Sequence, residues 1–233
     1  GLTGENVVSP AFGIRIPVSG VCRLRARVER SFRSPTFTER YYSDPANRGN
    51  PDLDPERSVS AEAGLDRTFR SGDLAGTVFL VRTSRVIDWT RDAGKTVWNA
   101  VNHGTLSTVG AELRGAMSLA RGWRLSGGYT RMRQDVTGRR GRESKYALCV
   151  PDGALALTAS GPLSGGVSCA MMLRSEHIRG EGSHSPDGIR FSGRIGMIDA
   201  RVGILNILND RYDEVPGLRA PGRRFTVEMG CSR

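Results

Sequence analysis

The residues best suited to ligand chemistry lie together in one polar segment of the N-terminal third. Tyr41 and Tyr42 are adjacent, and Asp44, Asn47 and Arg48 follow closely. Aromatic rings offer a large apolar contact area with a polar tip, while a carboxylate, an amide and a guanidinium add hydrogen bonds and charge. These five residues are predicted to contact a ligand. Loop packing or an interfacial aromatic girdle would explain the two tyrosines as well.

Two further groups of side chains are suited to an anionic or metal-bearing ligand. Arg139 and Arg140 form a basic cluster with Arg142, and such a cluster attracts anions and phosphate groups. His177 and His184 lie around another predicted outer loop. A solvated basic loop and exposed histidines without a ligand are the competing interpretations.

No arrangement of residues favours catalysis. Glu56, Glu62 and Asp66 follow one predicted strand without an acid/base partner. The four cysteines form no Cys-x-x-Cys pair, and no glycine-rich loop follows a strand and opens a helix. The sequence therefore predicts no enzyme, no metal site and no cofactor.

The charge balance is strongly basic, with a formal net charge of +10 over 233 residues. The arginines are spread along the whole chain and form no single patch, which argues against a nucleic-acid partner. No apolar stretch approaches the length of a membrane-spanning helix. Membrane-spanning β-strands remain compatible with this composition, because their apolar and polar residues alternate.

Strict alternation of apolar and polar residues is the main structural signal. In residues 22–29, cysteine, leucine, alanine and valine alternate with three arginines and a glutamate. This period of two is typical of a two-faced strand. No convincing helix is found. The pattern predicts eleven strands, at residues 5–16, 21–32, 56–70, 75–91, 104–120, 123–136, 145–160, 165–179, 188–197, 199–210 and 222–232.

Short and long connections alternate strictly between these strands. Tight turns are predicted at 17–20, 71–74, 121–122, 161–165 and 198–199, and long links at 33–55, 92–103, 137–144, 180–187 and 211–221. An up-and-down meander then places every long link at one rim, as in outer-membrane barrels. A soluble β-sandwich alternates in the same way. Long strands and an arginine-rich polar face favour the barrel.

Three sequence motifs resemble those of TonB-dependent outer-membrane receptors. Residues 32–36 read FRSPT, and residues 49–56 read GNPDLDPE, like the FR-x-P and N-P-x-L-x-P-E steps of that family. Residues 202–212 read VGILNILNDRY, and PGR follows at 221–223, as before the last strand of family members. Residues 98–102, followed by GAEL at 110–113, give a third and weaker match.

This resemblance implies an all-β fold, an antiparallel up-and-down transmembrane β-barrel. The eleven strands of residues 1–233 would form the C-terminal part of a 22-stranded barrel, without the plug domain and the N-terminal strands. Segments 5–16 and 222–232 would then expose unpaired edges, which lipid does not tolerate. We therefore expect a fragment, a truncated gene product or one segment of a longer protein.

The resemblance also implies a function and a location. Such a receptor lies in the outer membrane of Gram-negative-type cells. It holds a bulky, scarce ligand on its extracellular loops and imports it with energy from TonB, which acts through the plug. The implied partners are the TonB complex, outer-membrane lipid and lipopolysaccharide, the barrel-assembly machinery, and cobalamin or a ferric siderophore. Two alternatives remain: a non-transporting surface barrel or antigen, and a soluble β-sandwich binding module.

Several details bear on the ligand and on membrane insertion. Haem receptors of the family place a histidine between the first two motifs, and residues 34–49 contain none. The short spacing resembles cobalamin receptors most, with siderophore receptors close behind. Trp89 and Trp98 are expected to be girdle or loop anchors, and Trp123 to lie at the opposite interface. Arg233 stands where family barrels usually end in an aromatic residue, which puts efficient insertion in doubt.

Overall fold

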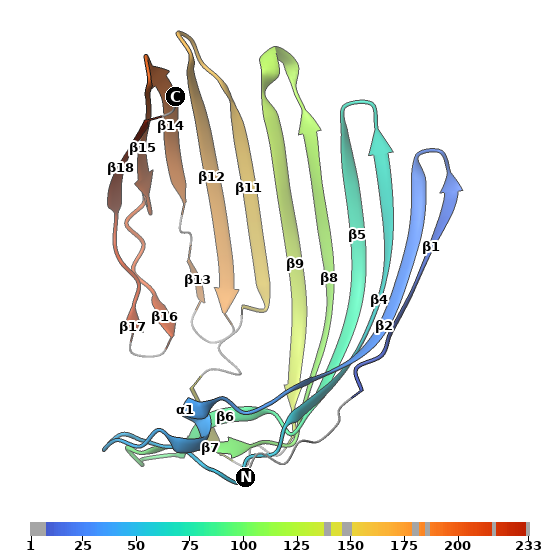
Figure 1. Ribbon diagram of the computed structural model, residues 1–233, viewed down its shortest axis with the longest axis vertical. Helices are drawn as coiled ribbons and strands as arrows, with labels where there is room; N and C mark the ends of the chain where they lie inside the picture. The colour runs from blue at the N-terminus through green and yellow to red at the C-terminus, as the bar shows by residue number, and fades with distance from the viewer. Residues whose placement is uncertain are drawn as a thin grey trace.

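The computed structural model describes residues 8–137, 141–145, 151–178, 182–184, 187–215 and 218–231. Most of them lie in one antiparallel sheet, the wall, which Figure 1 shows as a single curved layer. A short strand, β13 (Gly182–His184), pairs with the eighth strand of the wall's main path. That path runs in order through β1 (Ala11–Ser19), β2 (Cys22–Arg33), β4 (Glu56–Phe69), β5 (Gly72–Ser84), β8 (Thr105–Ser118), β9 (Arg124–Val136), β11 (Gly153–Pro162), β12 (Val167–Ile178), β14 (Gly188–Ile195), β15 (Ile198–Leu205) and β18 (Arg224–Cys231).

A smaller sheet, the rim sheet, lies at one end of the wall beside the helix α1 (Phe37–Tyr41) (Figure 1). Its order is β10 (Arg142–Ser144), β6 (Ile87–Asp92), β7 (Trp98–Asn102) and β3 (Asn47–Arg48), and β3 runs parallel to β7. A two-stranded sheet pairs β16 (Asp213–Val215) with β17 (Leu218–Arg219), and a 3₁₀ turn spans Ala120–Gly122. Within the described ranges, no helix is long and apolar enough to span a bilayer.

The meander predicted from the sequence is confirmed. Each wall strand pairs with its neighbours in chain order. The connections 20–21, 70–71, 119–123, 163–166 and 196–197 are short, whereas 34–55, 85–104, 137–152, 179–187 and 206–223 are long. Because alternate connections lie at the same end of an up-and-down sheet, all long connections share one rim.

Several predicted boundaries are wrong, for local reasons. The predicted strand 75–91 ends at Ser84, because Arg85 adopts a φ of 55° and the chain then enters β6 of the rim sheet. The predicted strand 199–210 ends at Leu205, before Asn206 with a φ of 52°. The first strand covers Ala11–Ser19 and continues through Pro17. Proline has no backbone N–H to donate to a neighbouring strand, and an edge strand tolerates this loss better than a central strand does.

The absence of helix is also a wrong prediction, because α1 forms at Phe37–Tyr41. Thr36 caps it, and Glu39 completes a capping box three residues later. The pattern Thr-x-x-Glu after Pro35 is a recognisable helix start in the sequence.

The two faces of the wall differ in chemistry. Residues that pair across neighbouring strands share a face, and Leu24 pairs with Leu65, while Leu113 pairs with Tyr129. These four residues belong to a continuous apolar face whose side chains remain accessible. Leu24, Met117 and Val227 are 46%, 43% and 65% exposed. A sandwich would bury them against a second sheet, so the β-sandwich alternative is wrong for this chain.

The opposite, polar face carries paired charges. Arg25 of β2 contacts Glu62 at 3.4 Å and Asp66 at 3.2 Å on the neighbouring strand β4, and it also donates to Thr77 of β5, the next strand along. Farther along the sheet, Arg201 contacts Glu228 at 3.3 Å. Such pairs add little stability each in water, on the order of 0.2–1 kcal/mol. Their importance is chemical, since this face suits enclosed water and not lipid.

The most deeply buried apolar cluster lies in the rim sheet and not in the wall. Leu53, Ile87, Trp89 and Ala100 are buried there, and Trp98 packs against them. Ala100 is 1% exposed and Leu53 is 3% exposed. The long connections thus form a small folded unit with its own core, which fixes the positions of its polar side chains.

Candidate ligand site at the long-connection rim

An ion-pair network joins the rim sheet to the wall. Arg33, at the end of β2, pairs across the strands with Glu56, at the start of β4. Its guanidinium donates to Glu56 Oε1 at 2.8 Å and Oε2 at 3.0 Å, and Nη1 donates to Glu39 of α1 at 3.0 Å. Glu56 Oε1 also accepts from the backbone N–H of Ile87 at 2.7 Å. Arg33 of the FR-x-P motif and Glu56 of the N-P-x-L-x-P-E motif therefore act together, and they hold α1 and β6 at the end of the wall.

Tyr41 lies apart from the other predicted residues. Its ring contacts that of Phe37 with 5.0 Å between centroids, and both side chains are exposed on α1. It lines neither of the two rim cavities described below. The structure therefore does not group Tyr41 with the cavity-lining residues.

Asp44 organises the turn between α1 and β3. Its carboxylate accepts the Tyr42 hydroxyl at 2.8 Å, the Ala46 N–H at 2.8 Å and the Asn47 amide at 3.0 Å. The hydrogen bond from Tyr42, followed by that from Asn47, lowers the pKa of Asp44 below its ordinary value. The same bond to Asp44 raises the pKa of the Tyr42 hydroxyl. Asp44 thus shapes the turn that presents Tyr42, Asn47 and Arg48.

The next two predicted residues form strand β3. Asn47 pairs with Trp98, and Arg48 pairs with Asn99 of β7. Asn47 Oδ1 also accepts from Lys145 Nζ at 3.1 Å, and that ammonium lies 5.7 Å from the Trp98 ring centroid. The parallel pairing places Arg48 on the exposed surface of the rim sheet.

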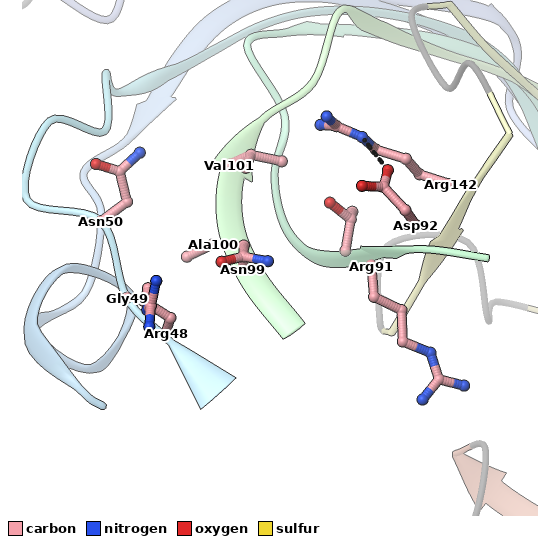
Figure 2. Close-up of a pocket in the computed structure, with 10 residues that line it drawn as sticks. Arg48, Gly49, Asn50, Arg91, Asp92, Asn99, Ala100, Val101 and Arg142 are labelled. Carbon is pink, nitrogen blue, oxygen red and sulfur yellow. Dashed lines mark hydrogen bonds and ion pairs between the residues drawn. The ribbon is translucent and has the colours of Figure 1, made fainter. Parts of the chain in front are cut away.

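An arginine-rich cavity of about 430 Å³ lies on this surface (Figure 2). Three arginines and one aspartate supply its charged groups. Arg142 Nε donates to Asp92 at 3.1 Å, whereas Arg91 contacts Glu143 at 2.6 Å and covers the Trp98 ring at 4.4 Å. The lining is Arg48, Gly49, Asn50, Thr90, Arg91, Asp92, Asn99, Ala100, Val101 and Arg142. With Arg142 paired to Asp92 and Arg91 paired to Glu143, Arg48 keeps the net charge of the cavity positive, and positive charge in a concave site favours an anionic ligand.

A second cavity, of about 770 Å³, separates the rim sheet from the polar face of the wall. Tyr42, Asn47, Trp89 and Lys145 line it from the rim side. Wall residues of the polar face line the other side: Thr83, Leu106 and Gln134. The rim sheet therefore folds over the polar face, and this identifies the polar face as the inner side of the curved wall.

Acidic groups distinguish the second cavity from the first. Glu39, Glu56 and Asp88 line it together with Arg33 and Lys145. Asp88 is 2% exposed, accepts from the Trp89 N–H at 2.8 Å and accepts from the Ser144 hydroxyl. These carboxylates are held by structural hydrogen bonds, so the first cavity offers the better anion site.

The structure brings together Tyr42, Asp44, Asn47 and Arg48, but it leaves the other predicted residues elsewhere or undescribed. Arg139 and Arg140 lie outside the described residues. His184 ends β13, which pairs with β12 of the wall, and its side chain is outside the description. Among described residues, no group of three or more His, Cys, Asp or Glu side chains is placed to hold a metal ion.

The aromatic predictions have mixed outcomes. Trp89 is a buried core residue and Trp98 packs on that core, so both anchor the rim sheet. A membrane girdle position is wrong for Trp89, which is 7% exposed. Trp123 follows the 3₁₀ turn at the opposite rim, as expected from its tight turn.

Arg91, Asn99 and Lys145 are among the cavity or support residues that were not predicted from the sequence. Arg91 and Asn99 lie in strand-like stretches beside tryptophans, and only pairing of β6 with β7 brings them together. Lys145 reaches Asn47 across 98 positions of sequence. No local pattern signals such contacts.

Comparison with known proteins gives a consistent family and fold. The model of the family "TonB dependent receptor-like, beta-barrel" matches residues 2–161. A search of curated proteins finds no match. Among solved structures, the chain is similar to the siderophore receptor PirA from Acinetobacter baumannii, at 17% identity and a TM-score of 0.71, over 95% of this chain and 40% of that one.

Two further solved structures show the same fold. The copper transporter OprC gives 13% identity and a TM-score of 0.73, over 95% of this chain and 39% of that one. The ferric enterobactin receptor PfeA from Pseudomonas aeruginosa, as a G324V mutant, gives 17% identity and a TM-score of 0.72, with the same coverage. The chain thus spans about 40% of the length of these proteins.

The family consists of outer-membrane receptors and transporters, not enzymes. Its model covers well over half of the chain, and the single-layer meander with long connections at one rim has the geometry that such barrels require. The chain belongs to the TonB-dependent receptor β-barrel family.

Proposed function

We propose that this chain forms the C-terminal part of the barrel of an outer-membrane receptor. In this proposal its apolar face meets lipid as a multi-pass β-barrel, and its polar face lines the lumen. The missing strands close the wall, and a plug domain connects the receptor to TonB. The proposal rests on the family match and on coverage of about 40% of each similar receptor. Insertion by the barrel-assembly machinery belongs to the same proposal.

We further propose that the ligand is an anionic metal complex, with a ferric siderophore favoured over cobalamin. The observation that carries this choice is the cavity lined by Arg48, Arg91 and Arg142, because guanidinium groups form strong charge-assisted bonds to anionic oxygens. Its volume of about 430 Å³ falls in the range of small-molecule sites. Similar structures include siderophore and ferric enterobactin receptors.

The test uses the complete receptor that carries this chain, purified in detergent, with ferric enterobactin and cobalamin as probes. Replacing Arg48 and Arg142 by Gln removes two cationic donors. If each contributes about 1.5 kcal/mol, affinity for ferric enterobactin falls by roughly 100-fold. Arg124→Gln, at the opposite rim, is the matched control and keeps parental affinity. Cobalamin binding that is stronger than ferric enterobactin binding and insensitive to the double variant would contradict the siderophore assignment.

A separate measurement addresses transport. Cells that express the complete receptor should lose accumulation of the ligand when TonB is removed, while binding at the cell surface persists. Accumulation that continues without TonB would overturn energised import. Binding without any TonB-dependent accumulation would favour the alternative of a non-transporting surface barrel.

A further inference from the structure

Three arginines gather on the apolar face of the wall, close to the long-connection rim. Arg30 of β2 and Arg82 of β5 both pair with Val59 of β4, from its two sides. Directly paired residues share a face, so both arginines lie on the same side as the exposed Val59. Arg57 lies two residues before Val59 and therefore shares this face. We call Arg30, Arg57 and Arg82 the outer arginine cluster.

These charges lie at the border of the apolar band. From β2 to β8 the next row toward the tight turns is apolar, since Val28 pairs with Ala61, Ala61 with Leu80, and Leu80 with Val109. All three large residues of that row are exposed. Within strands β2 to β8, the outer arginine cluster is thus the first charged group beyond this apolar row.

The position of the cluster matches the edge of a bilayer. From Val59 to Phe69 along β4 there are ten residue steps, or about 33 Å of strand. With a strand tilt of about 40°, this length covers roughly 25 Å along the barrel axis, the height of the apolar band of such barrels. Phe32, which pairs with Arg57, is exposed at one border, and Phe69 is exposed at the other. Aromatic residues at both borders are typical of membrane interfaces.

Two members of the cluster, Arg30 and Arg82, are available to an external anion. Arg30 and Arg82 are exposed, and neither forms an ion pair with an acidic side chain among the residues that the structure describes. Their α-carbons are two strand spacings apart, about 10 Å, so both guanidinium groups can reach one headgroup above Val59. Arg133 lies on the same face two strands from Arg82 but already contacts Asp135 at 3.3 Å.

Taking the membrane position of the proposed function as given, we propose that the outer arginine cluster binds phosphate groups of an outer-leaflet lipid. Guanidinium groups bind phosphate oxygens in a bidentate manner, and the apolar row beneath accepts the acyl chains. The ligand is a phosphorylated glycolipid held against the outside of the barrel. This site is separate from the arginine-rich cavity, because it lies on the opposite face of the wall.

The test compares lipid binding to the complete receptor in neutral detergent, with lipid A that carries two phosphates as the probe. Arg30→Gln with Arg82→Gln should weaken its binding by about 30-fold, given the usual contribution of each basic residue near an anionic lipid surface. The matched control is Arg23→Gln with Arg124→Gln, which removes the same charge from the polar face and should bind like the parent. Lipid A without phosphates should bind the parent about as weakly as the variant binds the phosphorylated form.

Two results with the variants would overturn the proposal. One is equal binding of phosphorylated lipid A by the parent and by Arg30→Gln/Arg82→Gln. The other is an equal loss in the polar-face control, which would indicate a general charge effect. Millimolar inorganic phosphate should not displace the lipid, and displacement would show a simple anion site instead. Ligand binding at the rim cavity is measured in parallel and stays unchanged in all these variants, so failure here is distinguishable from failure of the proposed import function.

Discussion

The wall and the rim sheet belong to the same chain, but they differ in whether their apolar side chains are exposed or buried. The wall leaves its apolar face accessible, with Leu24, Val78 and Leu113 each more than 40% exposed. The rim sheet buries Trp89, Ile87 and Leu53 in a small core of its own. In the proposed receptor, lipid and the rest of the barrel would cover the wall, whereas the rim sheet behaves as an ordinary small folded unit attached to the end of the wall.

This difference has a consequence for ligand binding. A cavity on flexible loops would pay the entropy of ordering when a ligand binds. Here the arginines of the cavity stand on β3, β6 and β10, which belong to one sheet in the order β10, β6, β7, β3. The rim sheet thus presents a largely ordered site. The ion pairs of Arg33 with Glu39 and Glu56 hold that site in a fixed position relative to the wall.

The largest effect is expected from removal of the core of the rim sheet. Trp89→Ala should destabilise it by about 3–5 kcal/mol, because a large buried side chain leaves a cavity. In the complete receptor, hydrogen exchange of residues 87–102 should rise sharply while wall strands stay protected. The matched control is Leu113→Ala on the apolar face, which should leave exchange at residues 87–102 unchanged. Loss of protection in the wall with Trp89→Ala would show that the two regions fold as one unit.

We expect the wall to be sensitive to a charge placed on its apolar face. Val78→Lys places a charge in the middle of the apolar face and should cost about 2–4 kcal/mol in the bilayer. Thr130→Lys on the polar face of β9 is the control and should be tolerated, because that face meets enclosed water. The yield of folded receptor in outer membranes measures both. A folded yield for Val78→Lys equal to that of Thr130→Lys would contradict the assignment of the faces.

A substitution at Arg33 tests the connection between the two regions. Arg33→Gln leaves the carboxylates of Glu39 and Glu56 without their guanidinium partner and should cost on the order of 2–3 kcal/mol locally. We expect weaker ligand binding and faster exchange at the Ile87 amide, with the Trp89 core still formed. Arg40→Gln, whose guanidinium contacts only the Leu53 carbonyl among the described bonds, should have a much smaller effect. Equal effects of the two variants would show that the network is not the connection.

The smallest expected effect is the pH dependence of the stability of the turn that Asp44 organises. The pKa of Asp44 is lowered, so its contribution is present above the unfolded pKa of about 3.9 and is lost as the pH falls through the folded value. The pKa of Tyr42 is raised, so its contribution is present below about pH 10 and is lost as the pH rises through the folded value. The turn should be constant between these limits. In Asp44→Asn, spectroscopic titration should show the Tyr42 pKa falling toward its ordinary value, and an unchanged pKa would exclude this bond.

The extended elements of the wall were predictable from the sequence, because a two-faced strand must alternate. Leu24 lies on the apolar face of the wall and its neighbour Arg25 lies on the polar face. Short and long connections alternate between these strands. The meander and its two unequal rims could therefore be predicted from local information alone. The sequence motifs at residues 32–36 and 49–56 indicated the family for the same reason, as they mark strand ends.

The rim site was predictable only in part. Tyr42, Asp44, Asn47 and Arg48 were found because they are neighbours in sequence, and a local turn holds them together. Arg91, Asn99 and Lys145 reach the site through pairing of β6, β7 and β10 and through a contact across 98 positions. The outer arginine cluster likewise needed the register, because only the pairing of Arg30 and Arg82 with Val59 shows that their charges share one patch. Alternation determines which face a residue takes, but contacts between distant segments depend on register and on loop packing, which only the tertiary structure decides.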